Sequence, residues 1–341
     1  MKKDLLHIFK DIDKLWSHIL KNVKIRNVSI QRNTTYYATP SKYLHKKIST
    51  QINKTKYTLT IFIASIKLGD SEYSIPFKIY SKGSPLNIKL IGSIALLLPC
   101  YFSKTTSASI TIIMTPFKKK LPNKKLEMIT SEHTNSGYTW GNEIIIYREE
   151  EHEKVLLHEM IHALGLDHIN IDYSDLIEKL NVKDGTQLNI NEAFTEFWTN
   201  IIYTMIWVSN NFKKHKEKKL IEHLEYDKSF SLLQIAKILN HFKYKNYRDL
   251  FKTINSSNCT FSQHTNVFSY YIVKGCLIHN LEDWCQLQKQ VLFKISNKSL
   301  KKITEQLKDR DFSRRVDDIF ILLPKIQNKT LLKTMRMTYH G

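Results

Sequence analysis

The sequence predicts an α+β protein, because two kinds of apolar periodicity follow one another along the chain. Residues 4–23 carry apolar side chains at helical spacing, and residues 28–80 change to alternating β-branched and aromatic residues. Helical spacing returns from residue 192 onwards. We therefore expect three regions: an N-terminal helix with a β-rich region at 1–84, a core with a small mixed sheet at 85–212, and a mostly helical C-terminal lobe with a basic tail at 213–341.

The individual elements follow from local patterns. In the first region the clearest strands are 57–63 and 73–80, with a turn signal at Gly69-Asp70 between them. In the core we expect a buried helix at 85–102, strands at 109–114 and 143–148, and a long apolar helix at 192–212.

Three basic segments are expected at the surface or at a boundary. The lysine-rich loop 116–125 is expected to be solvated, and the run 213–219 is expected to close the core. Beyond it we expect repeated short helices, for example at 232–239, and the tail after Pro324 is expected to be loose.

Composition limits the class of protein. The chain has 341 residues, of which 42% are hydrophobic and 25% charged, as in globular rather than disordered proteins. The formal net charge of +20 indicates attraction to polyanions. No nucleic-acid-binding motif accompanies this charge, so only a non-specific contact with nucleic acid or an anionic surface is expected.

The location expected from the sequence is intracellular. The N-terminus has acidic residues where a signal peptide needs an apolar core, and the apolar run 91–102 is too short to span a bilayer. We expect no membrane span and reduced cysteines, which have no metal-ligand spacing: Cys100, Cys259, Cys276 and Cys285.

The most specific motif is His158-Glu159-x-x-His162, on a predicted helix. Histidines four residues apart share one face of a helix and can bind a single Zn²⁺. Glu159 is then the expected general base for a zinc-bound water. A chain of this length and composition contains roughly 0.03 accidental matches. Two buried histidines without a metal would also need other polar partners.

Two residues compete to be the third ligand. His168 fits the spacing of metzincins, in which a glycine, here Gly165, permits a bend. Metzincins also need a methionine-containing turn, and the nearest downstream candidate, Met205, lies in an apolar helical run.

The second candidate is Glu192, in the segment Asn191-Glu192-Ala193-Phe194-Thr195-Glu196. In gluzincins a carboxylate from a downstream helix binds zinc, and a second carboxylate one turn later accepts a hydrogen bond from a ligand histidine. Glu192 and Glu196 are acidic residues on an otherwise apolar helix, where they need partners. We favour Glu192 as the ligand and Glu196 as its supporting carboxylate, with His168 as the alternative ligand.

Several segments together resemble a family of uncharacterised predicted metallopeptidases of large nucleocytoplasmic DNA viruses, and the resemblance covers residues 109–205. They are Thr115-Pro116-Phe117-Lys118-Lys119, Asn135-Ser136-Gly137-Tyr138-Thr139, Asn142 to Glu151, the motif from His158 to Asp167, and Glu192 to Trp198. The resemblance implies a zincin-like core with a gluzincin-type site. It also implies a viral origin and a place in the host cytoplasm or the virion.

The predicted function is that of a zinc-dependent metallopeptidase with a protein or peptide substrate. An extended peptide is expected to pair with the strand of Ile144, Ile145 and Ile146. Tyr270 or Tyr271 is the candidate oxyanion donor, with His264 as a further option. The alternative is a non-catalytic structural or nucleic-acid-associated virion protein on the same scaffold, using its positive charge.

Overall fold

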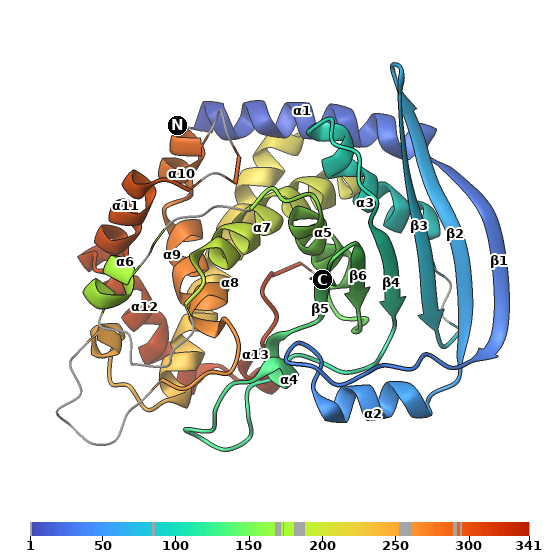
Figure 1. Ribbon diagram of the computed structural model, residues 1–341. Helices are drawn as coiled ribbons and strands as arrows, with labels where there is room; N and C mark the ends of the chain where they lie inside the picture. The colour runs from blue at the N-terminus through green and yellow to red at the C-terminus, as the bar shows by residue number, and fades with distance from the viewer. Residues whose placement is uncertain are drawn as a thin grey trace.

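One six-stranded mixed sheet forms the right-hand side of the molecule in Figure 1, and helices pack against it. The computed structural model describes residues 2–83, 86–167, 172, 174–180, 188–251, 261–288, 292–293 and 295–340. The strands are β1 (Lys24–Thr34), β2 (Tyr57–Leu68), β3 (Ser71–Ser81), β4 (Ser109–Ile113), β5 (Gly137–Trp140) and β6 (Glu143–Ile146).

The strand order is β1-β2-β3-β4-β6-β5. The three pairs β1–β2, β2–β3 and β5–β6 are antiparallel, whereas β3–β4 and β4–β6 are parallel. The edge strands are therefore β1 and β5. This corrects one prediction: Ile144, Ile145 and Ile146 lie on β6, between β4 and β5, so their strand has no open edge. The edge available to a peptide on this side is β5.

Helices lie beside the sheet, most of them on the left-hand side of Figure 1. They are α1 (Lys2–Asn22), α2 (Lys46–Lys54), α3 (Ile88–Tyr101), α4 (Ser131–Thr134), α5 (His152–Ala163), α6 (Ser174–Leu180), α7 (Ile190–Asn211), α8 (Lys216–His241), α9 (Lys274–His279), α10 (Leu281–Gln288), α11 (Asn297–Leu307), α12 (Arg310–Leu322) and α13 (Lys329–Lys333). The helix α2 lies below the strands on the right of Figure 1, and α3 lies next to β3 and β4. Two 3₁₀ turns, Tyr247–Phe251 and Leu323–Lys325, and a π-helical turn, Phe268–Val273, complete the set.

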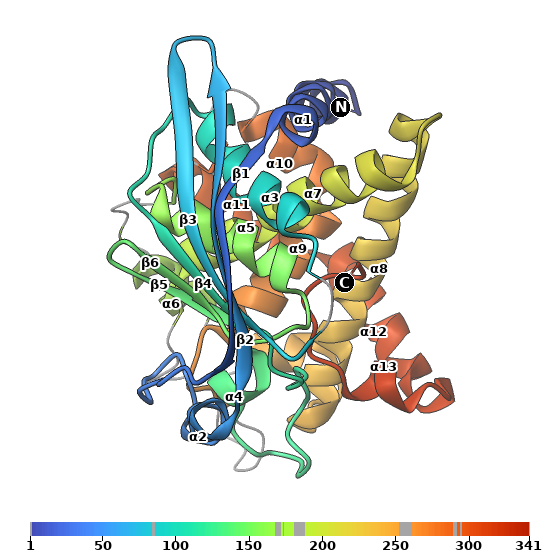
Figure 2. The ribbon, with the colours of Figure 1, turned by 90° about the vertical axis from the view of Figure 1, so that its right-hand side faces the viewer.

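The layers follow from the alternation of side chains along the strands. Phe62 and Ala64 of β2 face α3 and the main apolar core, whereas Leu59 faces a smaller cluster beside α2. α3 packs on β2 and β3, α5 packs on β5 and β6, and α7 lies between α5 and α8. Figure 2 shows the sheet on the left and α7, α8 and α12 on the right.

The α+β class is confirmed, and the predicted strands 57–63, 73–80 and 109–114 correspond to β2, β3 and β4. The sheet, however, joins strands from both sides of residue 84, and buried apolar residues of all three predicted regions belong to one cluster. No described helix is both long and apolar enough to cross a membrane.

Two basic segments and the helices beyond residue 213 differ from the prediction. The segment 232–239 is the second half of α8, a continuous helix of 26 residues. The last part of the predicted loose tail is packed into the interior, where Met335 and Thr338 are fully buried, whereas residues 327–330 before it are exposed. Lys119, in the predicted solvated loop, is also buried, and its ammonium pairs with Glu151. Lys119 and the end of the tail both contact Glu151, which is far away from each of them in the sequence.

The close approach of α3 to the sheet depends on Gly92. A Cβ atom at this position would lie 2.6 Å from the Cβ atom of Ala64 on β2. We predict that Gly92→Ala pushes α3 away from the sheet and lowers the free energy of unfolding by about 1–3 kcal/mol. Urea unfolding measures the change. Lys89→Ala on the exposed side of α3 is the control, and equal stability of the two variants would contradict the packing argument.

Candidate metal centre

The helix α5 presents His158 and His162 on the face that meets α7. It begins after Glu151, which has a left-handed φ of 58°, and ends before Gly165, which has a φ of 59°. A left-handed residue after a helix is a common C-terminal cap and turns the chain sharply. This turn brings Asp167 back towards His162.

The helix α7 contributes Glu192 from its first turn. The chain enters α7 at Asn189, whose side chain accepts a hydrogen bond from the N–H of Asn191. The helix therefore begins two residues before the predicted start at residue 192. Glu192 and Glu196, one turn apart, both face α5.

Three donor atoms converge between the two helices. The Nε2 atoms of His158 and His162 are 3.0 Å apart. Oε2 of Glu192 lies 3.5 Å from the first and 3.6 Å from the second. Within the described part of the chain, these residues are the one group of histidine, cysteine and acidic side chains whose geometry suits a metal ion.

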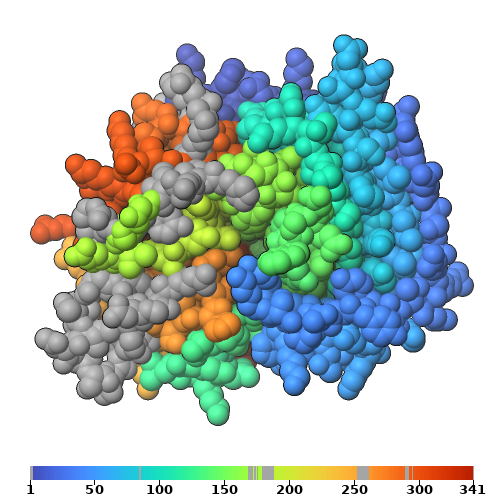
Figure 3. All heavy atoms as spheres, viewed as in Figure 1, coloured from blue at the N-terminus to red at the C-terminus, as the bar shows by residue number. Residues whose placement is uncertain are grey.

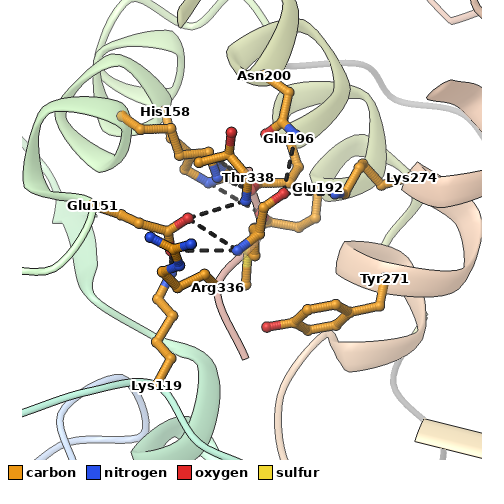
Figure 4. A network of polar contacts seen from close by, with 12 residues as sticks. Lys119, Glu151, His158, Glu192, Glu196, Asn200, Tyr271, Lys274, Arg336 and Thr338 are labelled. Carbon is orange, nitrogen blue, oxygen red and sulfur yellow. Dashed lines mark hydrogen bonds and ion pairs between the residues drawn. The ribbon is translucent and has the colours of Figure 1, made fainter. Parts of the chain in front are cut away.

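The Nδ1 atom of each imidazole is hydrogen-bonded to a carboxylate. Oε2 of Glu196 is 2.7 Å from Nδ1 of His158, and Oδ2 of Asp167 is 2.7 Å from Nδ1 of His162. A carboxylate accepts hydrogen bonds, so each Nδ1 carries the proton and each neutral ring turns the lone pair of Nε2 towards the centre. Figure 4 shows His158 and Glu196 within the surrounding polar network.

This arrangement fits a zinc ion. Two imidazole nitrogens at 3.0 Å need either a proton, which one Nε2 donates to the other, or a metal ion between them. Oε2 of Glu192 is buried and has no hydrogen-bond partner among the described residues. In a tetrahedral zinc site with bonds of about 2.0–2.1 Å, donor atoms lie roughly 3.3 Å apart. The observed separations of 3.0, 3.5 and 3.6 Å bracket that value.

Without a metal, the charges of His158, His162 and Glu192 depend on which of the three side chains is protonated. Burial lowers the pKa of His158 to about 4. Burial acts in the same direction on His162, but Glu192 and Asp167 outweigh it and raise its pKa well above the usual value. Burial also opposes the charge of Glu192, yet the two histidines hold its pKa well below the usual range. Without a metal, the pocket thus favours a protonated His162 that pairs with the carboxylate of Glu192.

Glu159 lies beside the ligands and is held by the edge strand. The hydroxyl of Thr139, on β5, donates a hydrogen bond of 2.8 Å to Oε2 of Glu159. Burial raises the pKa of Glu159 to about 7. At Gly137, a Cβ atom would lie 3.3 Å from Oε1 of Glu159, so glycine allows β5 to pass close to the carboxylate.

Of the two predicted tyrosines, the structure brings only Tyr270 to the site. Its ring lies 6.3 Å from the ring of His158. Burial and the charges of Glu192 and Glu159 raise its pKa well above the usual value. The hydroxyl of Tyr271 instead donates to the carbonyl of Met335 at 2.5 Å, and His264 is exposed.

A π-helical turn explains why Tyr270 faces the site. The turn Phe268–Val273 leads into α9 and changes the direction of successive side chains relative to a regular α-helix. Such turns are frequent at functional sites.

A small cavity of about 40 Å³ extends from the metal centre into the interior. This volume is sufficient to hold water. Both polar and apolar groups line it, from Lys119, Thr134, Asn135, Ser136, Gly137, Lys154, Val155, His158, Glu159, Glu196, Tyr270 and Met337. In the space-filling view a narrow hollow lies between the green β5–α5 region and the orange segment around residues 261–280 (Figure 3).

The structure therefore brings together six of the predicted site residues, His158, Glu159, His162, Glu192, Glu196 and Tyr270, and His168 lies outside the described residues. The sequence analysis missed three supporting residues: Asp167, Thr139 and Lys154. A possible signal for Asp167 was its place just after a helix-ending glycine, five residues beyond His162. Comparison with protein-family models, curated proteins and solved structures finds no match.

The two candidate third ligands can be separated by metal retention. We predict that the purified chain binds one Zn²⁺, that Glu192→Ala loses it, and that His168→Ala retains it. The reason is that Glu192 already lies beside both imidazole Nε2 atoms. Atomic absorption after dialysis against a weak chelator measures the zinc content. Retention by Glu192→Ala together with loss by His168→Ala would reverse the assignment.

Proposed function

We propose that this protein is a zinc-dependent metallopeptidase with a gluzincin-type site on a zincin-like core. The observation that supports this most directly is the pair of imidazoles, each backed by a carboxylate, with Glu192 in front and Glu159 alongside. The resemblance to predicted viral metallopeptidases points in the same direction, and with it we propose a place in the host cytoplasm or the virion.

His158, His162 and Glu192 would hold the zinc ion. When bound, Zn²⁺ acts as a Lewis acid that makes water a stronger acid and a substrate carbonyl more electrophilic. Glu159 is the general base: it accepts a proton as water attacks the carbonyl, and it then delivers that proton to the leaving amine. A pKa near 7 suits a group that must both accept and release a proton.

Tyr270 is the proposed donor for the oxyanion that forms during the attack. Its hydroxyl lies close to the ligand carboxylate and the general base, whose charges both act on it. A phenol with a raised pKa keeps its proton at neutral pH and can donate it in a hydrogen bond. No other predicted donor reaches the site, because Tyr271 is engaged with Met335 and His264 is exposed.

The strand β5 is the proposed binding edge for an extended peptide. Among the described strands it pairs with β6 alone, so its other edge is open. Thr139 connects this strand directly to Glu159. A peptide that adds to the edge by main-chain hydrogen bonds would pass the general base.

The second candidate function is a non-catalytic virion protein that binds nucleic acid or an anionic surface through its charge of +20. Salt-sensitive DNA binding without any peptide cleavage would favour it over the metallopeptidase.

Substitution of the general base tests the proposed chemistry. We predict that Glu159→Gln lowers cleavage of fluorescein-labelled casein by about 10²–10⁴-fold, because the amide cannot accept the proton. The zinc content should stay the same, since Glu159 is not a proposed ligand. The exposed Glu149→Gln is the matched control. Unchanged cleavage by Glu159→Gln would rule out this mechanism.

The adjacent tyrosines provide an internal comparison. We predict that Tyr270→Phe lowers kcat by about 10²–10³-fold with a much smaller effect on KM, because the lost hydrogen bond forms mainly in the transition state. Tyr271→Phe should lower stability through the loss of its bond to Met335, with kcat of the folded protein unchanged. Steady-state kinetics on casein-derived peptides measure both. A larger kcat effect at Tyr271 would contradict the assignment.

A further inference from the structure

A buried lysine stands directly behind the metal centre. Lys154 lies one turn before His158 on α5 and is 1% exposed. Its ammonium contacts Oε1 of Glu196. Lysine is almost never fully buried without a partner, so this position needs an explanation.

Glu196 connects Lys154 to the metal centre. One carboxylate oxygen contacts the ammonium, and the other lies 2.7 Å from Nδ1 of His158. A carboxylate that is fixed at both oxygens cannot rotate freely. Glu196 therefore sets the orientation of the His158 ring, and Lys154 sets the orientation of the Glu196 carboxylate.

The C-terminal segment supports the same network. Glu151, three residues before Lys154, accepts hydrogen bonds of 3.0 Å from the N–H groups of Met337 and Thr338, and one of 2.9 Å from Lys119. Figure 4 shows these contacts beside His158 and Glu196. Among the charged neighbours of Lys154, Glu151 contributes most to keeping its pKa from falling further, although burial still holds that pKa well below the usual value.

The segment is also held from other helices. The side chain of Asn200, on α7, donates to the carbonyl of Met337 at 3.0 Å, and Lys274, on α9, donates to the same carbonyl at 2.8 Å. Met337 itself lines the cavity beside His158. Met335, Met337, Thr338 and His340 are thus buried in the interior.

We propose that Lys154 is a positioning residue of the metal centre, which fixes Glu196 and through it His158. The inference rests on the proposed zinc site, which it deepens. It assigns Lys154 no contact with substrate or metal.

The expected effect of replacing Lys154 on zinc affinity follows from its contact with Glu196. Removal of a partner of a metal-ligating histidine commonly lowers metal affinity by about 10–100-fold. Lys154 acts one contact further out, so we expect Lys154→Met to weaken zinc binding by about tenfold. The three proposed ligands remain, so binding is weakened and not abolished.

Lys237 offers a matched control. It is a second buried lysine, and its ammonium donates to the carbonyls of Leu331 and Thr334, in the chain leading to the same C-terminal segment. It lies on α8 and has no contact with Glu196 or the histidines among the described residues. Lys237→Met should therefore lower stability without a change in zinc affinity.

The experiment measures zinc affinity by competition with a chromophoric chelator, and unfolding of the zinc-free protein by urea, for the full chain and both variants. A tenfold weaker affinity for Lys154→Met, beside an unchanged affinity for Lys237→Met, supports the proposal. Equal affinities for Lys154→Met and the unsubstituted protein would overturn it. So would an equal loss in both variants, since that would show a general effect of stability.

A second variant covers the case in which Lys154→Met does not fold. Lys154→Gln keeps an N–H donor near Glu196 and removes the charge, so a smaller loss of about threefold is expected, and full wild-type affinity would overturn the proposal. Failure of the proposed function is distinct from both results. In that case the unsubstituted protein itself would bind no zinc or would cleave no peptide.

Discussion

The two Nε2 atoms of His158 and His162 lie 3.0 Å apart, and the residues around them are arranged to hold the two rings in this position. Two imidazole nitrogens at this distance need a shared proton or a metal ion between them, and the rings turn this way because Glu196 and Asp167 hold their Nδ1 atoms. The end of α5 at Gly165 and the entry of α7 at Asn189 bring these carboxylates, and Glu192, to the same point.

Such a centre requires charged groups in the interior, and each must be paired because an unpaired buried charge is costly. Lys154 pairs with Glu196, and Lys119 with Glu151. Glu151 then takes two further hydrogen bonds from the main chain of the C-terminal segment. This need for hydrogen-bond donors explains why Met337 and Thr338, near the end of the chain, are buried, although the lysines of the same tail are exposed.

The cluster of residues at the candidate metal centre was predictable because its sequence signal is local. Residues four apart on a helix share a face, and two carboxylates on an apolar helix need partners, so the sequence pointed to His158, His162, Glu192 and Glu196. The tail contacts were not predictable, because Glu151 and Met337 are 186 residues apart in the chain. The buried lysines could not be recognised in the sequence, because most lysines of a protein are exposed and nothing in the sequence distinguishes the two kinds. The three consecutive isoleucines of β6, in contrast, are typical of a strand buried on both faces, which already argues against an edge.

A peptide bound at the edge strand β5 would lie closer to the general base of the proposed mechanism than one bound at β6. Thr139 belongs to the open edge strand and also holds the carboxylate of Glu159. A peptide paired to β5 would order this short strand, and the strand would in turn fix the carboxylate that accepts the proton. Gly137 makes the contact possible, since a side chain there would approach both Val155 and Glu159. Binding and base orientation would therefore depend on the same four residues, Gly137–Trp140.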